Sequence, residues 1–369
     1  MPAAAQTVAD LAREVAPRTE AGRALAPELL DALHEEQIFW LGVPRALGGG
    51  ERPPAETLAV AETIARGDAS AGWCVAIAAT SGLLGAYLLA EGASEVFGDP
   101  RSVAAGVWAP KGRGVDVPGG VEISGQWSFC SGIQHASWLF AGFVDSAGAM
   151  KVAALPKSSL EVLDTWHTTG LRGTGSHDSV ARSVFVPPHR VLSVMDGPLG
   201  DASALYRFPV FGFFALSVAS AALGNAFGAL DDFLALAVER SPFGSSRTLA
   251  ERSAVQAAVA EASASLKAAR AFFYSAVSAA WEEAQGSSPV SVSARTELRL
   301  AATFATRTAR SVVSSLYDLS GGGAIYDGAA LQRRFRDAHT ATAHFQVNLV
   351  SYEVPGKVLL GLPARTEQL

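Results

Sequence analysis

The spacing of hydrophobic residues changes twice along the chain and divides it into three parts. From Val8 to Gly98, apolar residues recur at intervals of three and four among charged positions, as amphipathic helices require. Between Arg101 and Val186, Gly, Pro, Asp and Ser separate short runs rich in β-branched and aromatic residues, which predicts strands. The expected strands are Ser102–Trp108, Val121–Phe129, Trp138–Val144, Lys151–Leu155 and Ser179–Val186.

From Tyr206 onward the spacing is again helical, and two long segments carry apolar stripes rich in alanine. The stripes are Val255, Val259, Ala262, Leu266, Ala269 and Phe273, then Leu298, Ala301, Ala305, Thr308, Val312 and Leu319. Alanine lets helices approach closely, so these stripes predict a nearly antiparallel bundle. The fold class is therefore expected to be α+β and mostly α, with a helical domain at 1–99, a β-domain at 100–200 and a helical bundle at 201–369.

Composition narrows the classes of protein to consider. Hydrophobic residues make up 49% of the chain and charged residues only 17%, which favours large subunit contacts. The net charge of −6 argues against nucleic acid as a partner. The stretch Ala69–Ala90 is long and apolar, yet its small residues and lack of basic flanks favour a buried helix pair over a membrane span. No signal peptide is visible, so the cytoplasm is the expected compartment.

Metal and nucleotide motifs are missing from the sequence. The seven histidines show no metal-ligand spacing, so we expect no metal. Cys74 and Cys130 lie in apolar surroundings and are expected to be small buried residues. Neither GxGxxG after a strand nor GxxxxGK[ST] occurs.

Two segments of the β-domain carry residues suited to a flat, polar-edged cofactor. In Trp127–Gly132, aromatic rings precede Ser131, and an isoalloxazine ring needs an aromatic wall and donors at its edge. In Trp166–Ser176, glycines alternate with hydroxyls, which exposes N–H groups to a ring edge or a phosphate. Ordinary strand packing and a glycine-rich connection remain the alternatives for these segments.

Two segments of the predicted bundle also carry candidate chemistry. Arg240, in Arg240–Gly244, is expected either to cap a helix or to bind a phosphate through two hydrogen bonds. The second segment, Arg333–His344, follows three glycines. Its Asp337, Ala341 and His344 have the spacing of one helical face. A lone histidine is more often structural than catalytic.

Together and in this order, these segments resemble the acyl-CoA dehydrogenase superfamily over nearly the whole chain. The similar segments are Val43-Pro44, Gly48–Gly50 and Arg66–Trp73 in its N-terminal domain, Trp127–Gly132, Leu171–Ser176 and Val184–Pro187 in its flavin-binding barrel, and Arg240–Gly244, Gln256, Gly321–Gly323 and Arg336-Asp337 in its bundle. The resemblance implies an N-terminal helical domain, a central β-barrel and a C-terminal four-helix bundle, with flavin tails held across a subunit interface.

The sequence departs from the dehydrogenases after Arg336-Asp337. Many dehydrogenases carry Tyr-Glu-Gly-Thr there, and the glutamate takes the α-proton of the thioester. This chain has His344-Phe345-Gln346-Val347 instead, and Phe345 cannot accept a proton. A histidine here resembles the superfamily's flavin-dependent monooxygenases, which take reduced FMN or FAD from a separate NAD(P)H-dependent reductase. With O₂ they form a C4a-hydroperoxyflavin and hydroxylate aromatic, polyketide or heteroatom substrates.

The resemblance implies the oxygenase component of such a two-component system, assembled as a homotetramer. Two alternatives stay open, an acyl-CoA dehydrogenase-like desaturase and a scaffold subunit without redox chemistry. His344 and Ser131 are the expected catalytic residues. Cofactor contacts are expected from Trp127, Phe129, Ser131, Gly132, Arg172, Thr174, Ser176, Arg240, Phe243, Gly322 and Gly323, and substrate contacts from Trp73, Trp108 and Phe345.

Overall fold

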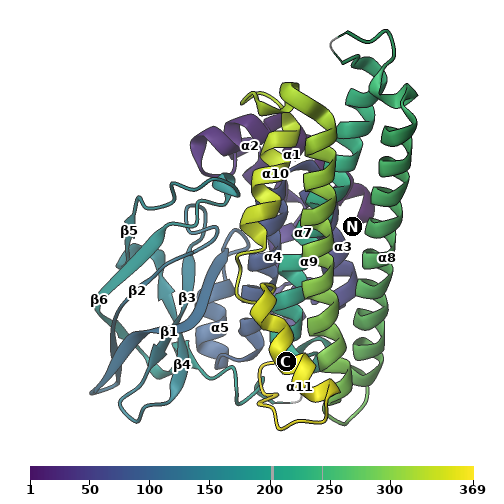
Figure 1. Ribbon diagram of the computed structural model, residues 1–369. Coiled ribbons are helices and arrows are strands. Elements are labelled where there is room, and N and C mark those ends of the chain that lie inside the picture. The colour runs from purple at the N-terminus through teal and green to yellow at the C-terminus, as the bar shows by residue number, and fades with distance from the viewer. Residues whose placement is uncertain (201–202, 243) are drawn as a thin grey trace.

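The computed structural model describes residues 1–200, 203–242 and 244–369. Helices form both ends of the chain, and a sheet lies between them in sequence and beside the long helices in space (Figure 1). The predicted fold class, with a helical domain, a barrel and a bundle, is confirmed. Phe243, an expected cofactor contact, lies outside the described residues.

Among the N-terminal helices, three start at a proline and a fourth at a side-chain cap. Their bounds are α1 (Pro2–Gly22), α2 (Pro27–Glu35), α3 (Pro54–Gly67), α4 (Ala69–Leu83) and α5 (Ala90–Phe97). Proline is the first residue of α1, α2 and α3, where its missing N–H costs no hydrogen bond. Asp68 caps α4 by accepting a hydrogen bond of 2.9 Å from the Ala71 N–H.

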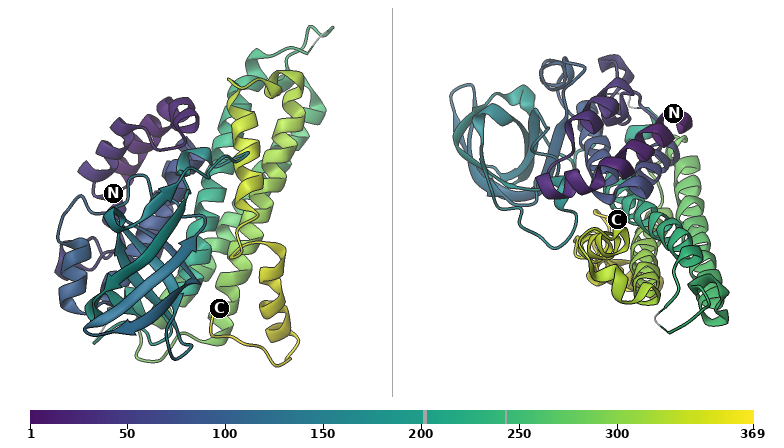
Figure 2. Two further views of the ribbon diagram at one scale, coloured as in Figure 1. Left: turned by 90° about the vertical axis from the view of Figure 1, so that its left-hand side faces the viewer. Right: turned by 90° about the horizontal axis from the view of Figure 1, so that it is seen from above.

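The sheet has the strand order β5-β6-β2-β1-β3-β4-β7 and curls into a barrel (Figure 2). The strands are β1 (Ala104–Val117), β2 (Gly120–Trp127), β3 (Trp138–Val144), β4 (Met150–Pro156), β5 (Glu161–Leu163), β6 (Asp178–Val186) and β7 (Val191–Leu192). Only the β1–β3 pair is parallel among the described strand pairs. All five predicted strands are present. The prediction missed β5 and β7, which are too short to show an alternating pattern.

The C-terminal part is built from long helices that lie side by side (Figure 1). Their bounds are α6 (Ala204–Arg207), α7 (Val210–Glu239), α8 (Ser253–Ala284), α9 (Val292–Ser320), α10 (Ala330–Ala341) and α11 (Glu353–Leu359). The alanine-rich stripes predicted for α8 and α9 face the core: Leu266, Ala269 and Phe273 of α8 are buried, as are Leu298 and Ala305 of α9.

The N-terminal helices share a core with the bundle rather than forming a separate layer. Helices α3 and α4 both pack against α7, and one apolar cluster joins Trp73 of α4 to Phe213 of α7 and Leu298 of α9. An ion pair from Arg66 to Asp231 crosses the same boundary at 2.5 Å. We propose domain boundaries near residues 99 and 200, because α5 ends at Phe97 and the last strand ends at Leu192.

Two helical segments are long and apolar enough to cross a membrane, Ala69–Ala86 and Val210–Glu239. Most of each segment is buried inside the protein, 94% of the first and 78% of the apolar window of the second. Their hydrophobicity is therefore accounted for by packing in the core.

Candidate functional site

The turn that follows β2 brings an exposed aromatic ring next to a buried hydroxyl. Phe129 has a φ of 65°, which is unfavourable for any residue with a Cβ, and its side chain is 70% exposed. Ser131, two residues later, is buried. Strain combined with an exposed ring is typical of a segment shaped for a ligand rather than for packing.

Three hydroxyls and an indole form a hydrogen-bonded chain behind this turn. Ser131 Oγ accepts a hydrogen bond of 3.1 Å from Trp73 Nε1 on α4 and lies 2.8 Å from Ser176 Oγ. Ser176 Oγ in turn lies 2.6 Å from Thr174 Oγ1. The expected cofactor residues Ser131, Thr174 and Ser176 are thus brought together, with Trp73 tying them to the N-terminal helices.

Aromatic rings continue from Trp73 into the bundle. The His344 ring lies edge-on to Trp73 at 5.6 Å and edge-on to Phe214 at 5.5 Å between ring centroids. Phe345 lies 4.9 Å from His344, and Trp108 lies 5.3 Å from Phe214. His344 and the three residues predicted for substrate contact are therefore connected through Phe214, and we call this group the ring cluster: Trp73, Trp108, Phe214, His344 and Phe345.

His344 is held by a turn and not by a helix. The prediction that Asp337, Ala341 and His344 share a helical face is wrong for His344, because α10 ends at Ala341. The His344 N–H donates to Ala341 O at 3.2 Å, and Nδ1 accepts from the Gln346 N–H at 3.3 Å. With Nδ1 accepting, the proton of the neutral ring sits on Nε2, which is then a donor.

Burial and a nearby positive charge keep His344 neutral. Burial, and to a lesser extent the charge of Arg299, lower the pKa of His344 to about 4. Arg299 is itself buried and holds the turn by donating to Gln346 O at 2.9 Å and to Gln368 O at 2.7 Å. At neutral pH the imidazole is therefore an uncharged hydrogen-bond donor in apolar surroundings.

A buried carboxylate anchors the loop that carries Thr174 and Ser176. Asp337 of α10 accepts a hydrogen bond of 2.6 Å from the Leu171 N–H, where Leu171 has a φ of 51°. The same helix passes so close that a Cβ at Gly170 would collide with Arg336 O. Burial, together with the charge of Asp68, raises the pKa of Asp337 to about 7.

The structure does not support the expected roles of Trp127 and Gly132 at the cofactor edge. Trp127 is fully buried in the barrel, and its Nε1 donates to Gly142 O at 2.7 Å, so the exposed ring on this segment is Phe129. The Gly132 N–H donates to Thr174 O at 2.9 Å, so it is not free for a ligand. Gly132 instead allows the turn, with a φ of 78°.

The remaining expected cofactor residues lie elsewhere. Arg240 is the C-cap of α7, and Gly323 lies so close that a Cβ there would collide with the Arg240 guanidinium. A Cβ at Gly322 would meet no atom. Arg172 lines a pocket of about 570 Å³ that Glu20 and Arg336 also line.

Sequence reasoning missed Phe214 and Arg299. Phe214 lies between His344 and Trp108, but an aromatic residue on an apolar helix gives no signal of its own. Arg299 could have been noticed because it lies among the alanines of the buried face of α9. An arginine on a buried face needs partners.

Comparisons with known proteins agree with the fold. Residues 3–96 match the family model "Acyl-CoA dehydrogenase, N-terminal domain" and residues 216–349 the model "Acyl-CoA dehydrogenase, C-terminal domain". The chain is 34% identical to an indole-3-acetate monooxygenase of Pseudomonas putida over 92% of this chain and 88% of the relative. It is 30% identical to the oxygenase component of an FADH₂-dependent resorcinol hydroxylase of Rhizobium, covering 96% and 92%.

Among solved structures, the HsaA monooxygenase of Mycobacterium tuberculosis superposes with a TM-score of 0.92 at 28% identity, covering all of this chain and 98% of the other. The similarity thus extends over the helical domain, the barrel and the bundle together. The chain belongs to the acyl-CoA dehydrogenase superfamily, and within it to the flavin-dependent monooxygenases.

Proposed function

We propose that the chain is the oxygenase component of a two-component monooxygenase that hydroxylates a small aromatic substrate with reduced flavin and O₂. The observation that carries this proposal is the ring cluster, in which neutral His344 lies between Trp73 and Phe214 next to the Ser131 hydroxyl chain. An acyl-CoA desaturase with its base at this turn would require a carboxylate there, and the ring cluster contains none.

The residues present fit a flavin ring. The Ser131–Ser176–Thr174 hydroxyls offer exchangeable donors and acceptors to a polar ring edge, and Phe129 presents an apolar ring beside them. The reduced flavin supplies the electrons and, with O₂, the oxygen atom that is transferred. The relatives' names include an FADH₂-dependent enzyme, and we propose reduced FAD or FMN delivered by a separate NAD(P)H-dependent reductase.

The protein's own groups prepare the site for this chemistry. The ring cluster is apolar and its Trp73 is buried, which limits the access of water and favours oxygen transfer over release of peroxide. Trp73 fixes the Ser131 hydroxyl by its N–H, and Asp337 fixes the loop that holds Thr174 and Ser176. His344 Nε2–H is the donor aimed at the reacting groups. It is neutral, so it donates without adding a charge to an apolar site.

The substrate class follows from the shape of the same cluster. Flat rings of Trp73, Trp108 and Phe214 stack or pack edge-on with another aromatic ring more favourably than with an aliphatic chain. The relatives act on indole-3-acetate and resorcinol by their names, and we propose an aromatic substrate of similar size.

The assembly we propose is a homotetramer located in the cytoplasm. Apolar side chains remain exposed along the C-terminal segment, and they include Phe345, Leu349, Val350, Leu359 and Leu360. Several large apolar side chains exposed on one segment favour a subunit contact. Arg240 and Gly323 lie near the α7–α8 connection, at the end of the bundle away from the sheet (Figure 1), where they would hold the flavin tail of a neighbouring subunit.

A single-turnover experiment tests the proposed function. Protein mixed with reduced FMN or FAD, isotopically labelled O₂ and indole-3-acetate or resorcinol is expected to give a product that contains one labelled oxygen atom. A desaturase would instead oxidise an acyl-CoA with oxidised flavin in the absence of O₂. That anaerobic oxidation, without oxygen incorporation into either aromatic compound, would replace the proposal by the desaturase alternative.

A further inference from the structure

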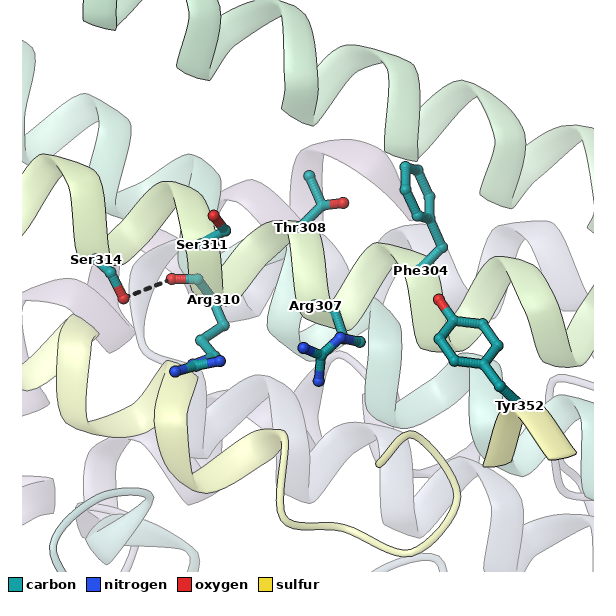
Figure 3. A pocket seen from close by; sticks show the side chains of 7 residues that line it. All are labelled: Phe304, Arg307, Thr308, Arg310, Ser311, Ser314 and Tyr352. Atoms are coloured by element: carbon teal, nitrogen blue, oxygen red, sulfur yellow. Dashed lines mark hydrogen bonds between the residues drawn. The ribbon is translucent and has the colours of Figure 1, made fainter. Parts of the chain in front are cut away.

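A second pocket, of about 440 Å³, lies on α9 beside Tyr352 and is lined by basic, hydroxyl and aromatic side chains (Figure 3). Arg307 and Arg310, three residues apart, extend to the same side of α9, toward the segment that follows α10 (Figure 3). Thr308 and Ser311 add hydroxyls to the lining. None of these residues has a role in the ring cluster or in the proposed contact with the flavin tail at Arg240 and Gly323, which we call the Arg240–Gly323 corner.

The charge of this pocket is not balanced within the chain. No carboxylate lines it, and among the described residues neither Arg307 nor Arg310 forms an ion pair. The other basic pocket is different, because Glu20 lies within 4 Å of both Arg333 and Arg336 there. Two half-buried guanidinium groups without a counter-charge favour a bound anion, since like charges in a partly desolvated site repel.

The geometry favours phosphate over a carboxylate. Arg307 and Arg310 bring two positive charges and several guanidinium N–H groups to the same pocket, and a doubly charged phosphate matches both charges and accepts several hydrogen bonds. His339 holds the Arg310 side chain in place. Arg310 Nε donates to His339 Nδ1 at 3.4 Å, and His339 Nε2 lies 3.1 Å from Ser314 Oγ. Tyr352 lines the same pocket as Arg307, and burial raises the pKa of its phenol.

The pocket also has room for an organic group attached to the phosphate. Phe304 is 44% exposed at its edge, and Tyr352 contributes a second ring to the lining (Figure 3). We propose that the Arg307–Arg310 pocket is a phosphate-binding site, separate from the Arg240–Gly323 corner, that takes inorganic phosphate or the phosphate of a small phosphorylated ring compound.

Binding measured by isothermal titration calorimetry, without O₂ or turnover, tests this site. The probes are inorganic phosphate, oxidised FMN and riboflavin, and the protein carries Arg240→Gln so that the corner does not contribute. Arg307→Gln combined with Arg310→Gln is expected to weaken phosphate and FMN binding by roughly 10- to 100-fold, the worth of one lost charge-assisted hydrogen bond. Riboflavin binding should not change. Arg182→Gln removes one positive charge from the barrel surface, where Arg182 pairs with Glu161, and should change nothing.

The probes also distinguish the two sources of phosphate. A larger loss of FMN affinity than of inorganic phosphate affinity in the double variant would identify a phosphorylated ring compound, and equal losses would identify the free ion. The single variants Arg307→Lys and Arg310→Lys keep the charge and should lose only part of the binding. Equal phosphate affinity with and without the two arginines would overturn the proposal. So would a change in oligomeric state by light scattering without phosphate binding, because the arginines would then pair with a second copy. Neither result bears on the proposed monooxygenase function.

Discussion

The indole of Trp73 donates a hydrogen bond of 3.1 Å to the hydroxyl of Ser131, and this contact joins α4 of the N-terminal helices to the turn after β2. Trp73 also meets His344, so a single side chain connects the barrel to the bundle at the candidate active site. The position of the Ser131 hydroxyl therefore depends on three parts of the chain that are far apart in sequence.

Replacing Ser131 by alanine should uncouple the reaction. The variant removes the partner of Trp73 and Ser176, so we expect the ratio of product to reduced flavin consumed to fall roughly two- to tenfold, the worth of one net hydrogen bond. The missing fraction should appear as hydrogen peroxide, measured in the same assay. Ser128→Ala is the matched control, because Ser128 lies on the same segment but bonds to Asp178. If Ser131→Ala and Ser128→Ala give the same ratio of product to reduced flavin consumed, Ser131 does not take part in the active site.

The neutral state of His344 gives a titration that can be measured directly. Its pKa is lowered to about 4 by burial and by Arg299, so the ring should protonate with a midpoint near that value when followed by NMR. The folded pKa lies below that of the unfolded chain. His344 therefore costs no stability at neutral pH and begins to destabilise the fold as the pH falls from about 6.5 toward about 4. A midpoint between about 6 and 7 would mean that His344 is not held in the apolar ring cluster.

Asp337 should make stability depend on pH in the opposite direction. Its pKa is raised from 3.8 to about 7, so the folded protein holds a proton that the unfolded chain releases, and stability falls as the pH rises through this range. Asp337→Asn keeps an oxygen for the Leu171 N–H and should reduce the loss of Tm between about pH 5 and about pH 8 by at least roughly 2 °C. Asp68, whose pKa is also raised by burial, will leave some dependence in the variant. Asp318→Asn, on the exposed side of α9, is the control and should match the unmodified protein. If Asp337→Asn matches it too, Asp337 does not titrate in this window.

Arg240 should contribute to flavin affinity through the phosphate. Arg240→Ala is expected to weaken binding of reduced FMN or FAD by about 1.5–3 kcal/mol, the usual worth of a charge-assisted hydrogen bond. Folding should be nearly unaffected, because the hydrogen bond at the end of α7 comes from the Arg240 backbone and not from its side chain. The Arg240 N–H donates to Leu236 O. An unchanged titration with reduced flavin would restrict Arg240 to the helix end.

The oligomeric state follows from the exposed apolar residues of the C-terminal segment. Light scattering at micromolar concentration should give the mass of a tetramer. Leu359→Glu combined with Leu360→Glu should shift the mass toward smaller species, because it places charges in a contact that excludes water. A stable monomer in the unmodified protein would contradict this assignment.

The fold could be predicted from the sequence because its signals are local. Helical spacing and the change to alternating strands each depend on neighbouring residues, and the structure has them where expected. The exceptions are also local: β5 and β7 are too short to show a period, and α10 ends before His344.

The site was only partly predictable because its contacts are distant in sequence. The grouping of Ser131, Thr174, Ser176 and Trp73 was anticipated only through the resemblance to a family. Spacing alone shows neither that the Gly132 N–H is taken by Thr174 nor that Trp127 points into the barrel. Phe214 and Arg299 act through partners more than 40 residues away, for which the local pattern of α7 or α9 offers no sign.

The most direct test of the central claim is product formation by His344→Ala in a single turnover with reduced flavin, O₂ and an aromatic substrate. The fold should survive, because the ring is held by a turn outside α10 and α11. Loss of the donor at the reacting groups predicts a fall in hydroxylation of roughly a hundred- to ten-thousandfold. Reduced flavin should still be oxidised by O₂, with peroxide released in place of product. Hydroxylation at the unmodified rate would contradict the account, since the reacting groups would then lie away from the ring cluster.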